Sequence, residues 1–232
     1  IASAIVAGGN NYVEGRYTTI GGGISHSGYS NYSFIGGGIC NCMGKTHFAN
    51  VFESSSNYGI NEGGSFIGGG KGNYIGGYNY ATVLGGTNNR ISGNNVNIDD
   101  PQFGGNDGIS ANASILGGQI NCILGPTGTS LEVLSGCWPS SNNSIIAGGT
   151  SQVINGSKGA FIGYGIQNKI CYSDHSSVIG GFVNTISGVT GDYGSNLNLI
   201  AGGWSNEIKT TNDNYGLNAI LGGLNNSLHD TS

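Results

Sequence analysis

The sequence predicts an all-β fold, a parallel β-solenoid of the β-roll or β-helix type, and three observations predict it. A frame of apolar, glycine and asparagine positions recurs along the chain, and glycine supplies 47 of the 232 residues. Asparagine supplies another 30, and both residue types disfavour helix interiors. Charge is scarce, with seven Lys or Arg, twelve Asp or Glu and a formal net charge of −5. A short unit repeated in tandem in this way stacks into a solenoid.

The composition also excludes other classes of protein. A collagen-like chain is excluded because the glycines have no three-residue period and only three prolines are present. A charge-driven disordered tail is excluded because 37% of the residues are hydrophobic. No apolar run approaches the roughly 18 residues of a membrane span. Seven basic residues provide no patch for nucleic acid or anionic lipid.

The repeat has the form apolar-x-Gly-Gly-x-x-Asn-x-apolar, as in Ile67–Ile75 and again sixteen residues later in Val83–Ile91. Apolar residues eight apart within short alternating segments predict two strands per unit. The eleven copies start at Val6, Ile20, Ile35, Ile67, Val83, Ile115, Ile146, Ile162, Val178, Ile200 and Ile220.

Each glycine pair predicts a tight corner between the two strands, because glycine reaches positive φ without a Cβ penalty. The predicted structural corners are Gly22, Gly23, Gly37, Gly38, Gly69, Gly70, Gly85, Gly86, Gly117, Gly118, Gly148, Gly149, Gly180, Gly181, Gly202, Gly203, Gly222 and Gly223. A second corner follows the second strand, where glycine recurs as in Gly125 and Gly156.

Asparagine occupies the seventh position of the frame in eight copies. These are Asn41, Asn73, Asn89, Asn121, Asn168, Asn184, Asn206 and Asn226. We expect an internal asparagine ladder in which each amide bonds the amide of the neighbouring coil, as in cross-β stacks. The alternative is that these asparagines are turn residues that form no ladder.

The number of coils is predicted from the spacing. Three spacings near 32 residues are interpreted as double periods with weak copies at Val51, Phe103 and Leu131. The chain then holds about fourteen coils of about 16 residues, a rod of roughly 65 Å at about 4.8 Å per coil. Residues 1–232 form a single repeat domain, with irregular coils or loops near 45–64, 94–113, 126–141, 189–197 and 210–217.

Neither end of the repeat carries a recognisable cap. Solenoids normally need polar terminal caps, and an uncovered last coil is an edge that templates pairing. We therefore expect either a segment of a longer protein or subunits that stack end to end into a filament.

Three segments carry a resemblance to a known family: Ser33-Phe34-Ile35-Gly36, Ser65-Phe66-Ile67-Gly68 and Ser176-Ser177-Val178-Ile179-Gly180. Their pattern resembles the YadA-like head repeats of trimeric autotransporter adhesins, and phage and large-virus fibre proteins with Ile-Gly-Gly repeats. The resemblance implies a left-handed β-roll, three chains per head, an adhesive role and a location that is extracellular, on the cell surface or on a virion. Here the unit is 16 rather than 14 residues, and Asn and Ile replace small Ala positions.

A trimer is also favoured independently of the resemblance. Sixteen residues with two corners enclose little core, and pooling apolar faces among three chains would remedy poor burial.

The five cysteines, Cys40, Cys42, Cys122, Cys137 and Cys171, lack the second Cys or His pair of a zinc site. We expect no metal and no cofactor. Cys42 and Cys122 share a frame position about five coils apart, too far for a disulfide. Buried thiols are one interpretation, and bridges between chains or from Cys137 are the other. Candidate glycosylation acceptors are Asn31, Asn112, Asn142, Asn155 and Asn225.

Enzyme candidates are few, and we expect no enzyme. Asp174-His175-Ser176 holds three triad residue types, but a triad is assembled from separate elements. Asp99, Asp100 and Asp107 have oxygen ligands for Ca²⁺ but not the calcium-binding nonapeptide, so a solvated loop is the interpretation. The Gly68–Lys71 run is a corner motif with no helix after it.

The sequence therefore predicts a structural subunit or shaft of an extracellular or virion fibre or filament. Its partner is itself, as a homotrimer or an end-to-end polymer. The alternative is an adhesin or receptor-binding module whose loops Lys45–Gly64, Asn94–Ala113 and Pro126–Ser141 bind host-surface glycans. Ice binding is a weaker alternative, since no Thr-rich lattice follows the frame, and a fibre-borne polysaccharide lyase is the weaker enzyme alternative.

Overall fold

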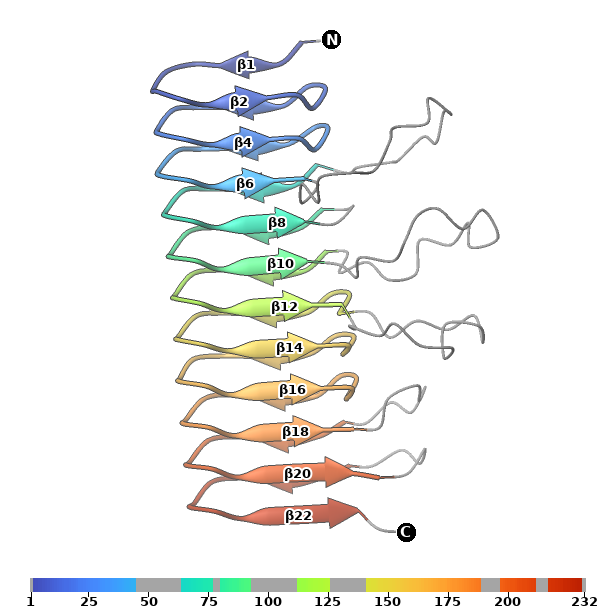
Figure 1. The fold of residues 1–232 in the computed structure, drawn as a ribbon. Coiled ribbons are helices and arrows are strands. Elements are labelled where there is room, and N and C mark those ends of the chain that lie inside the picture. The colour runs from blue at the N-terminus through green and yellow to red at the C-terminus, as the bar shows by residue number, and fades with distance from the viewer. Residues whose placement is uncertain are drawn as a thin grey trace, which may run out of the picture.

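The computed structural model describes residues 2–44, 64–76, 80–92, 112–125, 141–188, 197–211 and 217–230. These residues form two parallel sheets of eleven strands each and contain no helix, so none of them could cross a membrane as a helix. Successive coils stack directly on one another, and the two ends of the chain lie at opposite ends of the stack (Figure 1). The predicted all-β parallel β-solenoid is confirmed.

The odd sheet contains the odd-numbered strands, in sequence order along the rod. Its strands are β1 (Ala4–Ile5), β3 (Thr19–Ile20), β5 (Phe34–Ile35), β7 (Phe66–Ile67), β9 (Thr82–Val83), β11 (Ser114–Ile115), β13 (Ile145–Ile146), β15 (Phe161–Ile162), β17 (Ser177–Val178), β19 (Leu199–Ile200) and β21 (Ala219–Ile220).

The even sheet contains the even-numbered strands in the same order. They are β2 (Tyr12–Val13), β4 (Ser27–Gly28), β6 (Cys42–Met43), β8 (Tyr74–Gly76), β10 (Arg90–Ser92), β12 (Cys122–Leu124), β14 (Val153–Asn155), β16 (Lys169–Cys171), β18 (Thr185–Ser187), β20 (Glu207–Thr210) and β22 (Ser227–Asp230). Each coil therefore has one strand in each sheet.

The described stack contains eleven coils, not the predicted fourteen. β5 pairs directly with β7, β9 with β11, and β11 with β13, so no further strand lies between these neighbours. The weak copies expected at Val51, Phe103 and Leu131 lie outside the described residues, as do nearly all of the predicted irregular segments. Ten coil-to-coil steps of about 4.8 Å give a rod of about 48 Å. The 32-residue spacings are single coils with insertions.

The first copy of the repeat starts one residue earlier than expected. The register pairs Ile5, not Val6, with Ile20. Ile5 and Val6 are both apolar, so hydrophobicity does not show which of them faces the core. The register of the hydrogen bonds between coils determines that it is Ile5. Gly8 then takes the second glycine position with a φ of 98°, and Asn11 falls at the seventh position of the frame.

The core consists of two facing columns of aliphatic side chains. Ile67, Ile115 and Ile162 represent the column from the odd sheet, and Ile75 and Ile123 the column from the even sheet, all at most 1% exposed. The side chains before and after each core residue point outward, because successive residues of a strand alternate between faces. Burying such a side chain contributes about 1.5–3 kcal/mol relative to leaving it exposed.

The two corners of the coil differ. The glycine corner, between an odd strand and the following even strand, has the same length in every described coil, since the two core residues stay eight apart. A third column of parallel bridges, from Gly9 to Leu224, runs along it. The insertion corner, between an even strand and the next odd strand, absorbs all the variation: six internal stretches outside the described residues all lie there.

The outward positions of the two sheets differ in chemistry. On the odd sheet they are Ala4, Val6, Thr19, Gly21, Phe34, Gly36, Phe66, Gly68, Thr82, Leu84, Ser114, Leu116, Ile145, Ala147, Phe161, Gly163, Ser177, Ile179, Leu199, Ala201, Ala219 and Leu221. On the even sheet they are Tyr12, Glu14, Ser27, Tyr29, Cys42, Gly44, Tyr74, Gly76, Arg90, Ser92, Cys122, Leu124, Val153, Asn155, Lys169, Cys171, Thr185, Ser187, Glu207, Lys209, Ser227 and His229.

Candidate functional site

The most regular polar feature of the rod is an amide ladder inside the glycine corner. Its eleven rungs, six residues after each odd-strand core residue, are Asn11, His26, Asn41, Asn73, Asn89, Asn121, Gln152, Asn168, Asn184, Asn206 and Asn226. All eight predicted asparagines belong to it, and seven of them are fully buried. Asn11 was not predicted because the first copy of the repeat was expected to start at Val6 rather than Ile5. His26 and Gln152 were not predicted because only asparagine was considered at this position.

The ladder is bonded mainly from side-chain oxygen to backbone N–H, and the expected amide-to-amide bond occurs at two steps, from Asn184 Nδ2 to Asn168 Oδ1 and from Asn226 Nδ2 to Asn206 Oδ1, both at 3.1 Å. Asn89 Oδ1 accepts the backbone N–H of Asn121 at 3.0 Å, and Asn121 Oδ1 accepts that of Gln152 at 3.0 Å. Asn121 Nδ2 donates to Gly117 O of its own coil at 2.9 Å and to Gly149 O of the next coil at 3.0 Å. The amide fits because it combines one acceptor with two donors. A complete rung such as Asn121 therefore closes its own corner and bonds the next coil.

Two rungs are imperfect. His26 Nδ1 accepts the Asn41 N–H at 3.1 Å, so the neutral ring carries its hydrogen on Nε2, which is buried without a partner. Gln152 Oε1 accepts the Asn168 N–H at 2.9 Å, but its Nε2 is also buried without a partner. The longer side chains keep the acceptor of the ladder and lose its donors.

We expect His26→Asn and Gln152→Asn each to raise the free energy of unfolding by about 1–2 kcal/mol, because each supplies the two missing donor bonds. Urea unfolding followed by circular dichroism measures the change. Asn73→Gln, which introduces the same defect into a complete rung, is the matched reverse change and should lower stability. A destabilising effect of both asparagine substitutions would contradict this account of the ladder.

In most predicted pairs only the second glycine requires glycine; Gly180 is an exception, because a Cβ on this first member would lie 2.9 Å from Tyr164 O of the neighbouring coil. Gly118 has a φ of +88°, and a Cβ on it would lie 2.2 Å from Gly149 O of the next coil. Gly117 has no positive φ and nothing within 4 Å of a built Cβ, and Tyr164 occupies the equivalent place in another coil. The second member of each pair therefore has the positive φ of a corner glycine, whereas most of the first members have room for a side chain.

A second polar row lies inside the insertion corner and was not predicted. Two residues before each odd-strand core residue, every described coil has Ser, Thr, Ala or Asn. Ser144 Oγ accepts the N–H of Ala160 in the next coil at 3.2 Å and donates to Ser157 O at 2.7 Å. A side-chain oxygen again receives a backbone N–H of the next coil. The signal in the sequence was the run of small residues at this position.

The three residues of triad type, Asp174, His175 and Ser176, do not converge. Ser176 is buried and its Oγ lies 2.8 Å from Ser173 Oγ, whereas His175 is exposed. Asp174 Oδ1 accepts the Lys158 N–H at 2.7 Å. Burial raises the pKa of Asp174, and that N–H partly offsets the effect. The three side chains are used in turn structure and do not form a nucleophile–base–acid chain.

No group of three or more His, Cys, Asp or Glu side chains that could hold a metal occurs in the part of the chain that the structure describes. Asp99, Asp100 and Asp107 lie outside that part, as do Trp138 and the greater part of the three predicted binding loops. The Gly68–Lys71 run lies in a glycine corner between two strands, so it has no helix N-terminus for a phosphate.

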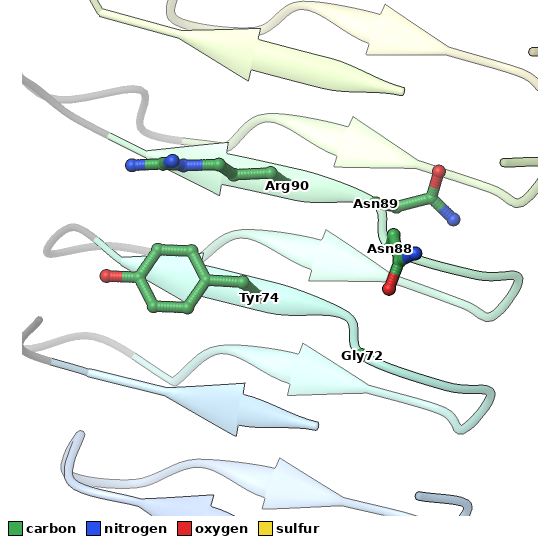
Figure 2. Close-up of a pocket in the computed structure, with 5 residues that line it drawn as sticks. All are labelled: Gly72, Tyr74, Asn88, Asn89 and Arg90. Carbon is green, nitrogen blue, oxygen red and sulfur yellow. The ribbon is translucent and has the colours of Figure 1, made fainter. Parts of the chain in front are cut away.

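A shallow hollow of about 230 Å³ lies on the even sheet, lined by Gly72, Tyr74, Asn88, Asn89 and Arg90 (Figure 2). The Arg90 guanidinium lies 5.4 Å from the centroid of the Tyr74 ring in the adjacent coil. Asn88 occupies the space above Gly72, since a Cβ there would lie 2.3 Å from Asn88 Oδ1. The hollow is smaller than the roughly 300–1,000 Å³ of small-molecule pockets.

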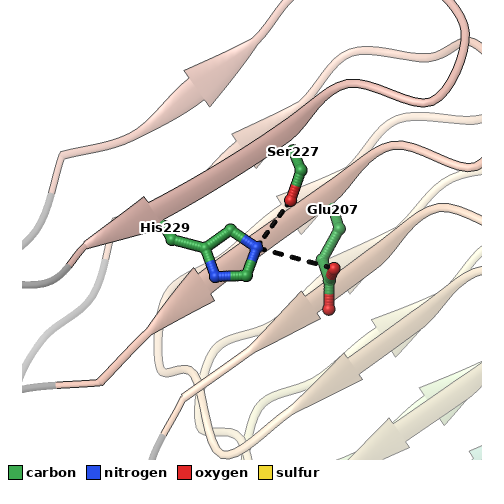
Figure 3. Close-up of polar contacts among 3 residues, drawn as sticks. All are labelled: Glu207, Ser227 and His229. Carbon is green, nitrogen blue, oxygen red and sulfur yellow. Dashed lines mark hydrogen bonds and ion pairs between the residues drawn. The ribbon is translucent and has the colours of Figure 1, made fainter.

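One ion pair lies at the C-terminal end of the even sheet (Figure 3). His229 Nε2 is 3.9 Å from Glu207 Oε2 and 2.6 Å from Ser227 Oγ. The side chains of His229 and Glu207 are 47% and 44% exposed, and exposed pairs contribute at most about 1 kcal/mol. This cluster is a surface contact between neighbouring coils.

The four described cysteines are free thiols. Cys42, Tyr74, Arg90 and Cys122 are consecutive in one row of the even sheet, so Cys42 and Cys122 are three coils apart rather than five. That separation of about 14 Å still excludes a disulfide between them. Burial raises the pKa of the Cys42, Cys122 and Cys171 thiols, whereas Cys40 is exposed at the glycine corner.

We expect Cys40 to react with iodoacetamide at pH 8 at least about tenfold faster than Cys42, Cys122 or Cys171, because only the accessible thiolate reacts. Peptide mapping by mass spectrometry after brief labelling measures each site separately. The unfolded chain in urea serves as the control, in which the four rates should converge. Equal rates in the native protein would contradict the described burial.

The five glycosylation sequons lie in different environments. Asn112 and Asn225 are exposed, each with φ near +54°. Asn31 Oδ1 accepts the Arg16 N–H at 2.7 Å, Asn142 is half-buried, and Asn155 Oδ1 is buried without a partner. Of these five, Asn112 and Asn225 have the accessible side chains that a glycan acceptor needs.

No family model matches the chain, and no curated protein sequence matches it either. The functional interpretation therefore rests on the geometry of the rod itself.

Proposed function

We propose that this chain is a structural subunit or shaft of an extracellular or virion fibre, and that it works through length and stiffness rather than through catalysis. The observation that carries the proposal is the unbroken hydrogen bonding along the axis. Both sheets, the bridge column and the amide ladder continue through all eleven described coils.

Stiffness follows from the direction of these bonds. Bending the rod would lengthen, on one side, several backbone bonds and one amide rung in each coil, such as the 3.0 Å bond from Asn121 N–H to Asn89 Oδ1. Each net hydrogen bond contributes about 0.5–1.5 kcal/mol, and the contributions recur at every step of about 4.8 Å. The glycine corner has the same length in every described coil, so this edge of the rod has no insertions. The resemblance of the repeats to adhesin heads and fibre proteins agrees with this role and with an extracellular, cell-surface or virion location.

X-ray diffraction from a flow-aligned sample of the whole chain, together with negative-stain electron microscopy, tests the proposal. We expect elongated particles, with a reflection near 4.8 Å oriented along the long axis. Compact particles without that reflection would contradict a fibre role.

A second candidate, an adhesin that binds host-surface glycans, is favoured by one observation. All six internal stretches outside the described residues begin and end at the insertion corner, so their described flanking residues all lie on one edge of the rod. Loops on a rigid scaffold are frequent binding elements. Glycan-array binding by the whole chain that is lost in Trp138→Ala would support the adhesin. A flat array would contradict the adhesin and leave the rod proposal standing.

A further inference from the structure

The outer face of the odd sheet is uncharged along its whole described length and predominantly apolar. Of its 22 outward positions, two for each of eleven strands, fourteen are Ala, Val, Leu, Ile or Phe, four are Gly and four are Ser or Thr. None is charged. Large aliphatic side chains are well exposed on it, including Leu84 at 50%, Leu116 at 46%, Ile179 at 49% and Leu221 at 78%.

The even sheet provides the comparison within the same molecule. Its 22 outward positions hold two aliphatic residues, Leu124 and Val153, and five of the ten charged residues in the described ranges. The apolar character is therefore a property of one face and not of the low charge of the chain as a whole. An exposed apolar patch of this extent marks an interaction surface.

The shape of the odd face suits contact with another extended surface. It follows a stack about 48 Å long and is about 10 Å, or three residues, wide. The Phe34 and Phe66 rings stack at 5.6 Å and lie over Gly36 and Gly68, where a Cβ would approach each ring to within 3.5 Å or less. The projected area of about 500 Å² is bordered at the glycine corner by Ile24, Ile39, Ile166 and Trp204, each 45–56% exposed. With this border the face approaches the roughly 800 Å² per partner of a stable interface.

We infer that this face is covered by the same face of a second copy of the chain, with the rods associated side by side. The inference rests on the proposed fibre role and names the partner and the surface. A second copy matches because it repeats the same step of about 4.8 Å over the same length, so that side chains of one rod enter the spaces between coils of the other. Without charges on the face, burying it leaves no ion unpaired.

The test uses the whole chain and two double variants that place the same charges on opposite faces of the same two coils. Leu116→Glu with Ile145→Glu changes the odd face, and Cys122→Glu with Val153→Glu changes the even face. In the control the two glutamates are direct neighbours in the sheet, and their mutual repulsion is offset because Arg90 is the other neighbour of Cys122 and Lys169 the other neighbour of Val153. Circular dichroism and thermal melting verify that both variants keep the β-solenoid.

Sedimentation equilibrium over about 1–100 µM measures the association. We expect the wild type to form a homo-oligomer, the odd-face variant to have a dissociation constant at least about 100-fold higher, and the even-face variant to resemble the wild type. A monomeric wild type, or an odd-face variant that associates as tightly as the wild type, would overturn the inference; the latter result would assign association to another surface of the rod. A monomer with the axial 4.8 Å repeat would leave the fibre role intact, so the two failures are distinguishable.

If the odd-face variant does not fold, Thr82→Glu at a polar position of the same face replaces it. This variant should also have a higher dissociation constant than the wild type, and association as tight as that of the wild type would again overturn the inference.

Discussion

Gly118→Ala is expected to lower the free energy of unfolding by more than about 4 kcal/mol, a large part of the stability of an ordinary domain. The Cβ would lie 2.2 Å from Gly149 O and 2.5 Å from Asn121 Nδ2, at a backbone φ of +88°. Because the obstructing atoms include the backbone of the next coil, the clash is relieved only by separating the two coils. That separation breaks the bond from Gln119 N–H to Gly149 O, now 2.8 Å.

Gly117→Ala is the matched control for this prediction, since it makes the same chemical change one residue earlier. It has no positive φ and no neighbour within 4 Å of the new Cβ, so we expect a change within about 0.5 kcal/mol. Urea unfolding of both variants, monitored by circular dichroism, gives the two values. Similar losses from the two substitutions would contradict the geometry of the glycine corner.

Asn121→Ala is expected to lower the free energy of unfolding by about 3 kcal/mol. The substitution removes the acceptor of the buried Gln152 N–H and the donor to Gly117 O, and it deprives Gly149 O of one of its two bonds. Leaving a buried polar group without a partner costs about 1–3 kcal/mol, which exceeds the net gain from an average hydrogen bond.

Two variants separate this effect from simple loss of a side chain. Asn121→Gln should cost less than Asn121→Ala, because Gln152 keeps the acceptor function at its own rung. Gln119→Ala, at an exposed position of the same glycine corner, should change stability by less than about 0.5 kcal/mol. If Gln119→Ala were as costly as Asn121→Ala, the ladder would not be the source of the stabilisation.

The candidate site was predictable where it repeats and not where a single copy departs from the pattern. Eight ladder asparagines followed from their spacing, because the same corner in each coil imposes the same polar requirement. His26 and Gln152 did not, since only the ladder geometry identifies an imidazole nitrogen and a longer amide as equivalents of Asn Oδ1. The triad, calcium and phosphate-loop candidates depended on adjacency in sequence, which contains no information about convergence in space.

By itself the sequence determined the fold class, the two strands per coil, the glycine corner and the positions of the asparagine rungs. These are local requirements of conformation and alternation, so they leave a periodic mark on the chain. The tertiary structure alone decided the eleven coils, the register at Ile5, the direction of the amide bonds and the apolar outer face of the odd sheet. The physical reason is that lengthening an insertion whose two ends meet at a corner costs little free energy of loop closure. The number of coils therefore cannot be calculated from the length of the chain. Register and face, in turn, depend on which backbone groups of neighbouring coils bond to each other.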